Sequence, residues 1–214
     1  MHKLHLPQPL RYSEDLDYVR TSKSGIKELT TTLTELGEGL GLEVRTRVTE
    51  HPKVLWRTTA QTGIPLRLKI EVNTHERSPA LPHLNHPYAV RSAWWSGQSD
   101  VRTFQRVELV ATKIRALYQR SKGRDLFDLW LALDQLALDP NAILAAFEPY
   151  RPAGLTSGKA IANLDAKRRA GGFRSDLAPL VLRMPDGFDV DSAADRITTE
   201  LLSRLDANPN QKGA

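Results

Sequence analysis

Residues 11–20 read Arg-Tyr-Ser-Glu-Asp-Leu-Asp-Tyr-Val-Arg, and this stretch decides how the chain is interpreted. Because alternate side chains of an extended strand share a face, Asp15 and Asp17 project one way and Leu16 and Tyr18 the other. Two adjacent carboxylates repel each other unless a cation lies between them, and a hard divalent ion such as Mg²⁺ prefers oxygen ligands. An Asp-x-Asp pair is also common at polar strand edges and turns, so the pair alone leaves both interpretations open.

The most regular alternation in the chain lies at residues 64–73, which predicts a half-buried strand. One face carries only apolar side chains and the other is polar: Ile64, Leu66, Leu68, Ile70 and Val72 against Arg67, Lys69, Glu71 and Asn73. A neighbouring strand with Asp15 and Asp17 would bring Glu71 beside them and place three carboxylates around one cation. Lys69 would compensate their charge or touch a phosphate. An antiparallel sheet with one wet face explains the alternation equally well.

Strands dominate the first half of the chain and helices the second. The first ten residues are expected to form a loop, and residues 74–88 a second, long loop. Apolar residues at intervals of three and four predict helices at 24–40, 103–119, 124–136, 140–148 and 156–170, with a last helix capped by Asp191. Alternation predicts strands at 42–50, 54–60, 64–73 and 90–95. The expected class is α+β, with a strand-rich domain at 1–100, a helical domain at 101–206 and a flexible tail at 207–214.

Composition excludes several classes of protein. The 214 residues include no cysteine, which rules out disulfides and thiolate zinc sites and fits a reducing, cytoplasmic location. No apolar run approaches the roughly 20 residues of a membrane helix, so no membrane partner is expected. His75, His83 and His86 match no common zinc spacing.

Positive charge is concentrated in two segments of a chain whose net charge is only +5. Residues 101–124 contain Arg102, Arg106, Lys113, Arg115, Arg120, Lys122 and Arg124. Residues 151–183 contain Arg151, Lys159, Lys167, Arg168, Arg169, Arg174 and Arg183. Such clusters are typical of a phosphate-rich partner, and equally of a solvated basic face.

Four motifs in one order carry a family resemblance. They are Arg-Tyr-Ser-Glu-Asp-Leu-Asp (11–17), Leu-Lys-Ile-Glu-Val (68–72), Thr-Lys-Ile-Arg-Ala-Leu (112–117) and Arg-Ser-Lys-Gly-Arg-Asp-Leu-Phe-Asp-Leu (120–129). With these motifs the chain resembles the nucleotidyltransferase toxins of the AbiEii/AbiGii kind, which include the MenT toxins. The resemblance covers about residues 10–135, and the last motif is its most specific part.

The resemblance implies a nucleotidyltransferase-fold mixed sheet followed by an all-helical domain. It implies a toxin with a cognate antitoxin, which adds nucleotides from an NTP to the 3′ acceptor end of tRNA and so blocks translation. By this comparison Asp15, Asp17 and Glu71 hold Mg²⁺, and Lys113 and Asp125 are catalytic together with the two aspartates. The phosphates are contacted by Ser13, Lys69, Arg120, Lys122 and Arg124.

One departure concerns the first motif, which in the family begins with Gly-Gly-Thr or Gly-Ser before the Asp-x-Asp. That glycine-rich turn leads a helix whose N–H groups hold the triphosphate. Here Met1 to Leu6 resemble the sequence just after it, so the first strand and phosphate loop are expected to be missing and NTP binding to be weak. Two alternatives stay open: a kinase-like phosphotransferase that modifies a protein hydroxyl such as that of Ser13, or a non-catalytic module that binds RNA or an antitoxin.

Overall fold

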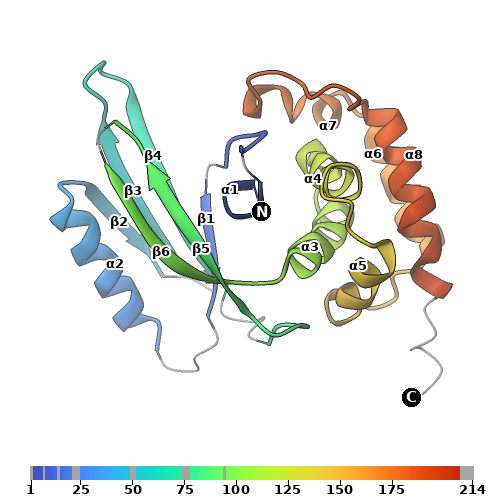
Figure 1. The fold of residues 1–214 in the computed structure, drawn as a ribbon, viewed down its shortest axis with the longest axis horizontal. Coiled ribbons are helices and arrows are strands. Elements are labelled where there is room, and N and C mark those ends of the chain that lie inside the picture. Colours follow the sequence, from blue (N-terminus) through green and yellow to red (C-terminus); the bar gives the residue numbers. More distant parts are fainter. Residues whose placement is uncertain are drawn as a thin grey trace. The chain divides into compact units, whose positions relative to one another are not determined.

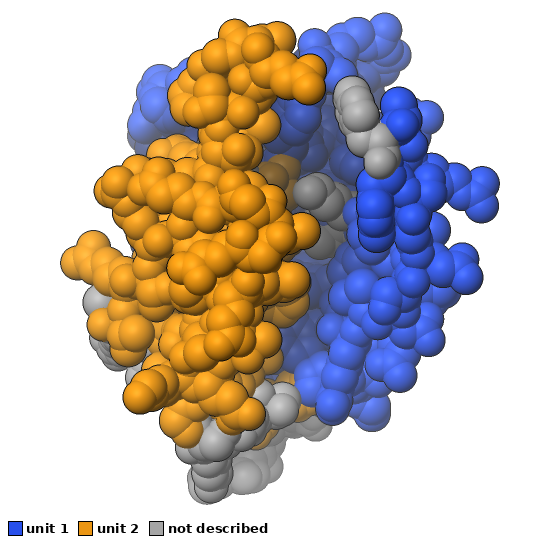
Figure 2. All heavy atoms as spheres, turned by 90° about the vertical axis from the view of Figure 1, so that its left-hand side faces the viewer, with its two compact units in different colours: residues 1–12, 80–214 blue, residues 13–79 orange. Residues whose placement is uncertain are grey.

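The computed structural model describes residues 2–6, 8–13, 15–20, 25–48, 52–73, 78–93 and 95–207, whose helices and strands are drawn in Figure 1. The chain divides into two compact units, which Figure 2 distinguishes by colour. Unit 2 comprises Ser13–Pro79, and unit 1 comprises Met1–Tyr12 together with Ala80–Ala214. Mixed helices and strands confirm the α+β class. The predicted tail lies outside the described residues, apart from Ala207.

Unit 2 is built around a four-stranded mixed sheet. Its strands are β1 (Asp15–Val19), β2 (Glu43–Arg47), β3 (Lys53–Thr59) and β4 (Pro65–Asn73), and their spatial order is β1-β4-β3-β2. β1 is parallel to β4, while β3 is antiparallel to both β4 and β2. The mixed sheet that the family resemblance implies is therefore present.

One face of this sheet is apolar and packs against α2 (Lys27–Gly39), the one long helix in the described part of unit 2. The indole Nε1 of Trp56 on β3 donates a hydrogen bond to the carbonyl of Leu33 on α2, at 3.1 Å. A Cβ at Gly37 would lie only 2.6 Å from the side chains of Trp56 and Val44, so only glycine allows α2 to approach the sheet this closely. The opposite face carries the charged side chains.

Unit 1 combines a two-stranded antiparallel hairpin with a helical core. The hairpin is β5 (Leu84–Arg91) and β6 (Ser96–Thr103). The helices are α1 (His2–His5), α3 (Arg106–Gln119), α4 (Gly123–Asp134), α5 (Pro140–Phe147), α6 (Ser157–Arg168), α7 (Gly171–Ser175) and α8 (Val190–Glu200), with 3-10 turns at Glu148–Tyr150, Ala178–Leu180 and Leu202–Ala207.

Helix α4 is the centre of the helical core. Residues 126–133 are all buried, as their nearly continuous apolar sequence predicts. Phe127 packs against Trp130 and Phe188, with ring centroids 5.8 and 5.0 Å away. This packing fixes the position of α4 and therefore the positions from which its side chains project.

Several expected elements differ from the observed ones. Residues 2–5 form helix α1 instead of a loop, because His2 and His5 are buried in unit 1. Residues 84–88, which were expected to end the long loop, instead belong to strand β5 (84–91) in spite of Pro87. A two-stranded hairpin has only edge strands, and proline is tolerated there. Of the strand expected at 90–95, residues 90 and 91 form the end of β5, and the next strand, β6, begins only at Ser96.

Two helix boundaries also differ. Asp189, not Asp191, caps α8, because its carboxylate accepts hydrogen bonds from the N–H groups of Asp191 and Ser192 at 3.0 and 2.9 Å. Gly171 begins α7 instead of ending α6. Among the described helices none is both long and apolar enough to cross a membrane.

Candidate active site

The candidate acidic residues lie on the charged face of the unit 2 sheet. The register of β1 and β4 pairs Asp15 with Lys69 and Asp17 with Glu71, so all four side chains share one face. Leu16 and Tyr18 project to the other face, as the alternation predicts. Strand pairing thus brings Glu71 beside Asp15 and Asp17, although more than 50 positions separate it from them in the sequence.

Lysine side chains neutralise two of these carboxylates. The Nζ of Lys69 lies 2.8 Å from Asp15 Oδ2 and 3.1 Å from Glu71 Oε2, and the Nζ of Lys53 lies 3.3 Å from Glu71 Oε1. The hydrogen bond to Asp15 raises the pKa of Lys69, with a further contribution from Glu71. Burial alone would raise the pKa of Glu71, but Lys69 and Lys53 outweigh it and the pKa is lowered. Both groups are therefore held in their charged forms at neutral pH.

The donor chemistry of Asp15, Asp17 and Glu71 suits a hard cation, since each side chain offers carboxylate oxygens on the same face. As placed, however, the described residues contain no group of three or more His, Asp or Glu side chains arranged to hold a metal ion. The ammonium of Lys69 sits between Asp15 and Glu71, where a cation would bridge them. Lys69 therefore supplies the positive charge that this pair of acids requires.

Ser13 lies two residues before the acidic pair and is exposed. Its hydroxyl donates a hydrogen bond to the carbonyl oxygen of Asp15 at 3.2 Å, a local turn that leads into β1. Ser13 is predicted to contact a phosphate, and its exposed position beside Asp15 is compatible with that role.

The second candidate cluster belongs to unit 1 and joins α3 to α4. Lys113, on α3, has its Nζ 3.0 Å from Asp128 Oδ2 and 3.6 Å from Asp125 Oδ1. Both aspartates are on α4 and are completely buried. The lysine on the edge of the apolar stripe of α3 therefore reaches a pair of carboxylates and does not extend freely into solvent.

Asp125 is held by Arg120 as well as by Lys113. The Nε and Nη2 atoms of Arg120 donate to the two oxygens of Asp125 at 2.6 and 2.7 Å, a bidentate arrangement. Asp125 also lies in the first turn of α4, where a carboxylate is favoured by the helix dipole. These contacts give the predicted catalytic Asp125 a fixed orientation.

Asp128 is the most heavily contacted carboxylate of this cluster, and the sequence identifies it only as part of the 120–129 motif. Arg11 donates to it through Nε and Nη2 at 2.8 and 2.7 Å, and His2 Nε2 lies 2.8 Å from Oδ1. Burial would raise the pKa of Asp128, but Lys113, Arg11 and His2 hold it well below the usual range. The i,i+3 spacing from Asp125 marked a shared helix face, whereas nothing local pointed to partners more than 100 residues away.

The other predicted phosphate contacts surround the start of α4. Lys122 Nζ lies 3.2 Å from Asp176 Oδ1, and the N–H of Arg124 donates to Asp176 Oδ2 at 3.3 Å. A Cβ at Gly123 would lie 2.1 Å from the carbonyl oxygen of Phe173, so only glycine lets α4 begin against this segment. Lys122 and Arg124 thus also fasten α4 to the residues that follow α7.

Most of the basic side chains at 151–183 are engaged within unit 1. Lys167 Nζ donates to the carbonyls of Leu117 and Tyr118, and burial lowers its pKa. Arg151 bonds the carbonyls of Leu155 and Leu205. Ion pairs or carbonyl contacts are also made by Arg168, Arg174, Arg183 and Lys159. This segment stabilises the helical unit through its charges.

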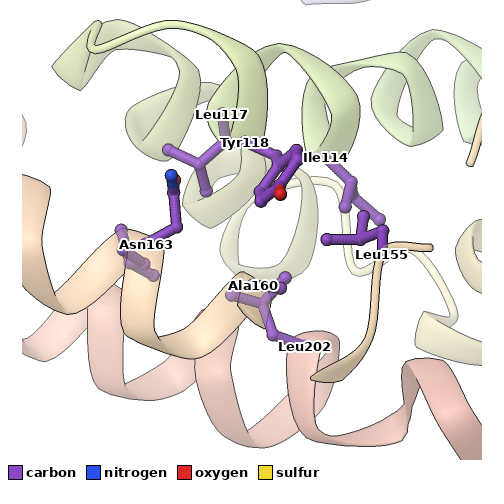
Figure 3. Close-up of a pocket in the computed structure, with 8 residues that line it drawn as sticks. Ile114, Leu117, Tyr118, Leu155, Ala160, Asn163 and Leu202 are labelled. Atoms are coloured by element: carbon purple, nitrogen blue, oxygen red, sulfur yellow. The ribbon is translucent and has the colours of Figure 1, made fainter. Parts of the chain in front are cut away.

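An internal cavity of unit 1, drawn in Figure 3, is too small for a substrate. It lies between α3 and α6, is lined mainly by apolar side chains such as Ile114, Leu117 and Leu164, and has a volume of about 10 Å³, roughly one water molecule.

The histidines considered for a zinc site make aromatic contacts where they are described. His83 stacks on Phe104 and His86 packs against His5, while His75 lies outside the described residues.

Comparisons with known proteins concern the fold and the family of the chain. None of the curated proteins compared with the chain matches it. Among solved structures, the chain is similar to the nucleotidyltransferase toxin MenT4 from Mycobacterium tuberculosis H37Rv, with a TM-score of 0.62 and 17% identity over 97% of this chain and 73% of that one. At this identity the likeness concerns the fold. The family model described as "Nucleotidyl transferase AbiEii toxin, Type IV TA system" matches residues 1–204. The chain therefore belongs to the AbiEii nucleotidyl transferase toxin family of toxin–antitoxin systems.

Proposed function

We propose that this chain transfers a nucleotide from an NTP to the 3′ acceptor end of tRNA, and that its activity is restrained by a cognate antitoxin protein. The observation that carries the proposal is the pairing of Asp15 and Asp17 with Lys69 and Glu71 across β1 and β4. Carboxylates on an open sheet face suit a metal ion that contacts phosphate, and a lysine beside them suits the negative charge of the phosphate itself. Membership of the AbiEii family supports the same chemistry.

In the proposed reaction the 3′-hydroxyl oxygen of the RNA forms a bond to the α-phosphorus of the NTP and releases its proton to solvent. The bond between that phosphorus and the oxygen bridging to the β-phosphate breaks, and pyrophosphate leaves with the bonding electron pair. Asp15, Asp17 and Glu71 would hold Mg²⁺, which when bound stabilises charge on the attacking and leaving oxygens. The ammonium group of Lys69 would then leave its ion pairs with Asp15 and Glu71 and contact a substrate phosphate instead. Lys113 would neutralise charge that develops on phosphate oxygens, with Asp125 orienting it.

Exposed polar groups support the proposed contacts with phosphate. Ser13 offers its hydroxyl next to Asp15, and Arg120 and Lys122 each keep nearly half of their side-chain surface exposed. Arg124, which is more buried, would contribute through its position at the start of α4.

A labelling experiment tests the proposal. The chain is incubated with tRNA, Mg²⁺ and each NTP labelled either at the α- or at the γ-phosphate. We expect label on tRNA only from the α-labelled substrate, no label on tRNA whose 3′-terminal ribose has been oxidised, and loss of labelling with EDTA. Asp15→Asn should lower the rate at least 100-fold. Full activity of that variant would overturn the assignment of the acids.

The same samples distinguish the alternatives. Label from the γ-phosphate on the protein, with a phosphate adduct at Ser13 by mass spectrometry, would instead identify a kinase-like phosphotransferase. Tight binding of tRNA with no Mg²⁺-dependent product would identify a binding module.

A further inference from the structure

A second feature of the charged sheet face is a pair of arginines that lie opposite each other. The register of β3 and β4 places Arg57 against Arg67, on the same face as Lys69 and the acids. Like charges directly opposite in a sheet are destabilising unless an anion lies near them. Within the described part of the chain neither arginine takes part in an ion pair. Glu43, which faces Arg57 from β2, instead accepts a hydrogen bond from Arg45 at 2.8 Å.

The two arginines line an open groove at the end of the sheet where β3 turns into β4, a turn that is visible in Figure 1. The groove has a volume of about 740 Å³ and lies wholly within unit 2. Its other lining residues add hydroxyl groups and apolar surface: Gly41, Glu43, Thr58, Thr59, Pro65 and Leu66. Guanidinium groups bind phosphate in a bidentate manner, which makes the two arginines a suitable contact for a phosphate group.

The groove is aligned with the acidic cluster along one strand. Arg67, Lys69 and Glu71 occupy alternate positions of β4 on one face, so neighbouring side chains are spaced by about 7 Å. A nucleic acid strand whose end lies at Asp15 and Glu71 would next pass Lys69 and then reach Arg67 and Arg57. The basic segment at 151–183 is a weaker candidate for this contact, because its charges are engaged within unit 1.

We propose that this arginine groove binds backbone phosphates of the acceptor RNA just upstream of its 3′ end. The inference rests on the proposed function and names the surface that would hold its RNA substrate. A groove of about 740 Å³ has room for whole nucleotides, and its arginines continue the charged face beyond Lys69, so it fits RNA better than a bare triphosphate.

Binding and kinetics of arginine variants test the proposal. Arg57→Gln, Arg67→Gln and the double variant are compared with Lys27→Gln, which removes one positive charge from helix α2 in the same unit. Binding of tRNA is followed by fluorescence anisotropy over a range of salt concentrations. Each arginine variant should weaken binding several-fold and lower the slope of log affinity against log salt by about 0.7. The KM for tRNA should rise while the KM for NTP stays unchanged, and the thermal stability should not fall because the repulsion between the arginines is relieved. Lys27→Gln should resemble the parent chain.

Other outcomes are decisive against the proposal. A rise in the KM for NTP without a change in tRNA binding would assign the groove to the triphosphate. Arginine variants that bind tRNA as Lys27→Gln does would show that the groove binds no RNA. If the parent chain binds tRNA in a salt-dependent way but transfers no nucleotide, the proposed function fails, while the salt slopes still decide whether the groove is the RNA contact. A parent chain that binds no RNA would overturn both.

Discussion

The two lysine–carboxylate clusters of this protein differ most in their burial. In unit 2, Lys69 and Asp15 each keep about a third of their side-chain surface exposed, at 34% and 35%. In unit 1, Asp125 and Asp128 are at 0%. Charges at a surface interact weakly and exchange partners easily, whereas a buried carboxylate that loses its partner is strongly destabilising. The comparison indicates that in the open cluster Lys69 can exchange a carboxylate for a substrate or a cation. In the other cluster the buried carboxylates hold α3 and α4 together, and only Lys113 is partly exposed.

The largest expected effect comes from removing one charge from the buried cluster. Asp128→Asn keeps the size of the side chain but leaves Arg11 and Lys113 without their carboxylate, so it should cost about 3–5 kcal/mol of unfolding free energy. Urea denaturation followed by circular dichroism measures the loss. The matched variant Asp15→Asn in the open cluster should change stability by less than about 1 kcal/mol. Similar losses in the two variants would remove the distinction between the clusters.

Acid should affect the buried part of unit 1 through His5. Its ring is buried, neither ring nitrogen has a hydrogen-bond partner among the described residues, and burial lowers its pKa from 6.5 to about 4. A histidine with a lowered pKa leaves stability intact above pH 6.5 and reduces it as the pH falls toward 4, here by up to about 3 kcal/mol. Denaturant midpoints at pH 7, 5.5 and 4.5 should show this loss, and His5→Phe should flatten it.

His5→Gln serves as the control, because it removes the ionisable ring without filling the space. It should give the same flat pH profile as His5→Phe, at lower overall stability. Parallel profiles for the parent chain and both variants would show that His5 ionises without cost.

A smaller effect is expected at the close approach that lets α4 begin. Gly123→Ala places a Cβ 2.1 Å from the carbonyl oxygen of Phe173, so backbone must shift, and we expect a loss of about 1–3 kcal/mol. Gly158→Ala is the matched control, since nothing lies within 4 Å of its Cβ and alanine favours helix α6. Calorimetric melting temperatures of the two variants should therefore change in opposite directions.

The smallest effect is expected for Lys53→Gln in the open cluster. Its ion pair with Glu71 at 3.3 Å is partly exposed, so its loss should change the unfolding free energy by less than about 1 kcal/mol. Because Lys53 helps to lower the pKa of Glu71, that pKa should rise toward its ordinary value, which NMR titration of the carboxyl carbon would detect. A large loss of stability in Lys53→Gln would mean that the open cluster, like the buried one, is needed to hold the fold together.

The acidic half of the candidate site was predictable because it rests on local alternation. Once residues 15–19 and 64–73 are recognised as neighbouring strands, the shared face of Asp15, Asp17 and Glu71 follows from the pleat. The helical frame around Lys113 and Asp125 was likewise visible in the spacing of apolar residues. The β5 strand was hidden by Pro87, which is unfavourable in most strands but acceptable at an edge.

What the sequence could not reveal are contacts that depend on the assembled fold. Helix α1 is too short to be stable by itself, and its burial depends on partners on α4. The opposed arginines Arg57 and Arg67 depend on the register of β3 and β4, which the turn between those strands determines. Single-sequence patterns contain neither kind of information.

The contacts of Asp128 also have a consequence for the order of folding. His2 and Arg11 are 126 and 117 positions away from Asp128, whereas Arg120 is only five positions from Asp125. Closing the longer loop costs about 3 kcal/mol more chain entropy than closing the shorter one. The α3–α4 turn should therefore form early, and the N-terminal segment should dock late, after the strands of unit 2 have shortened the intervening chain. The last contact to form would then also be the first to open, so α1 should exchange its amide protons well before α4 does.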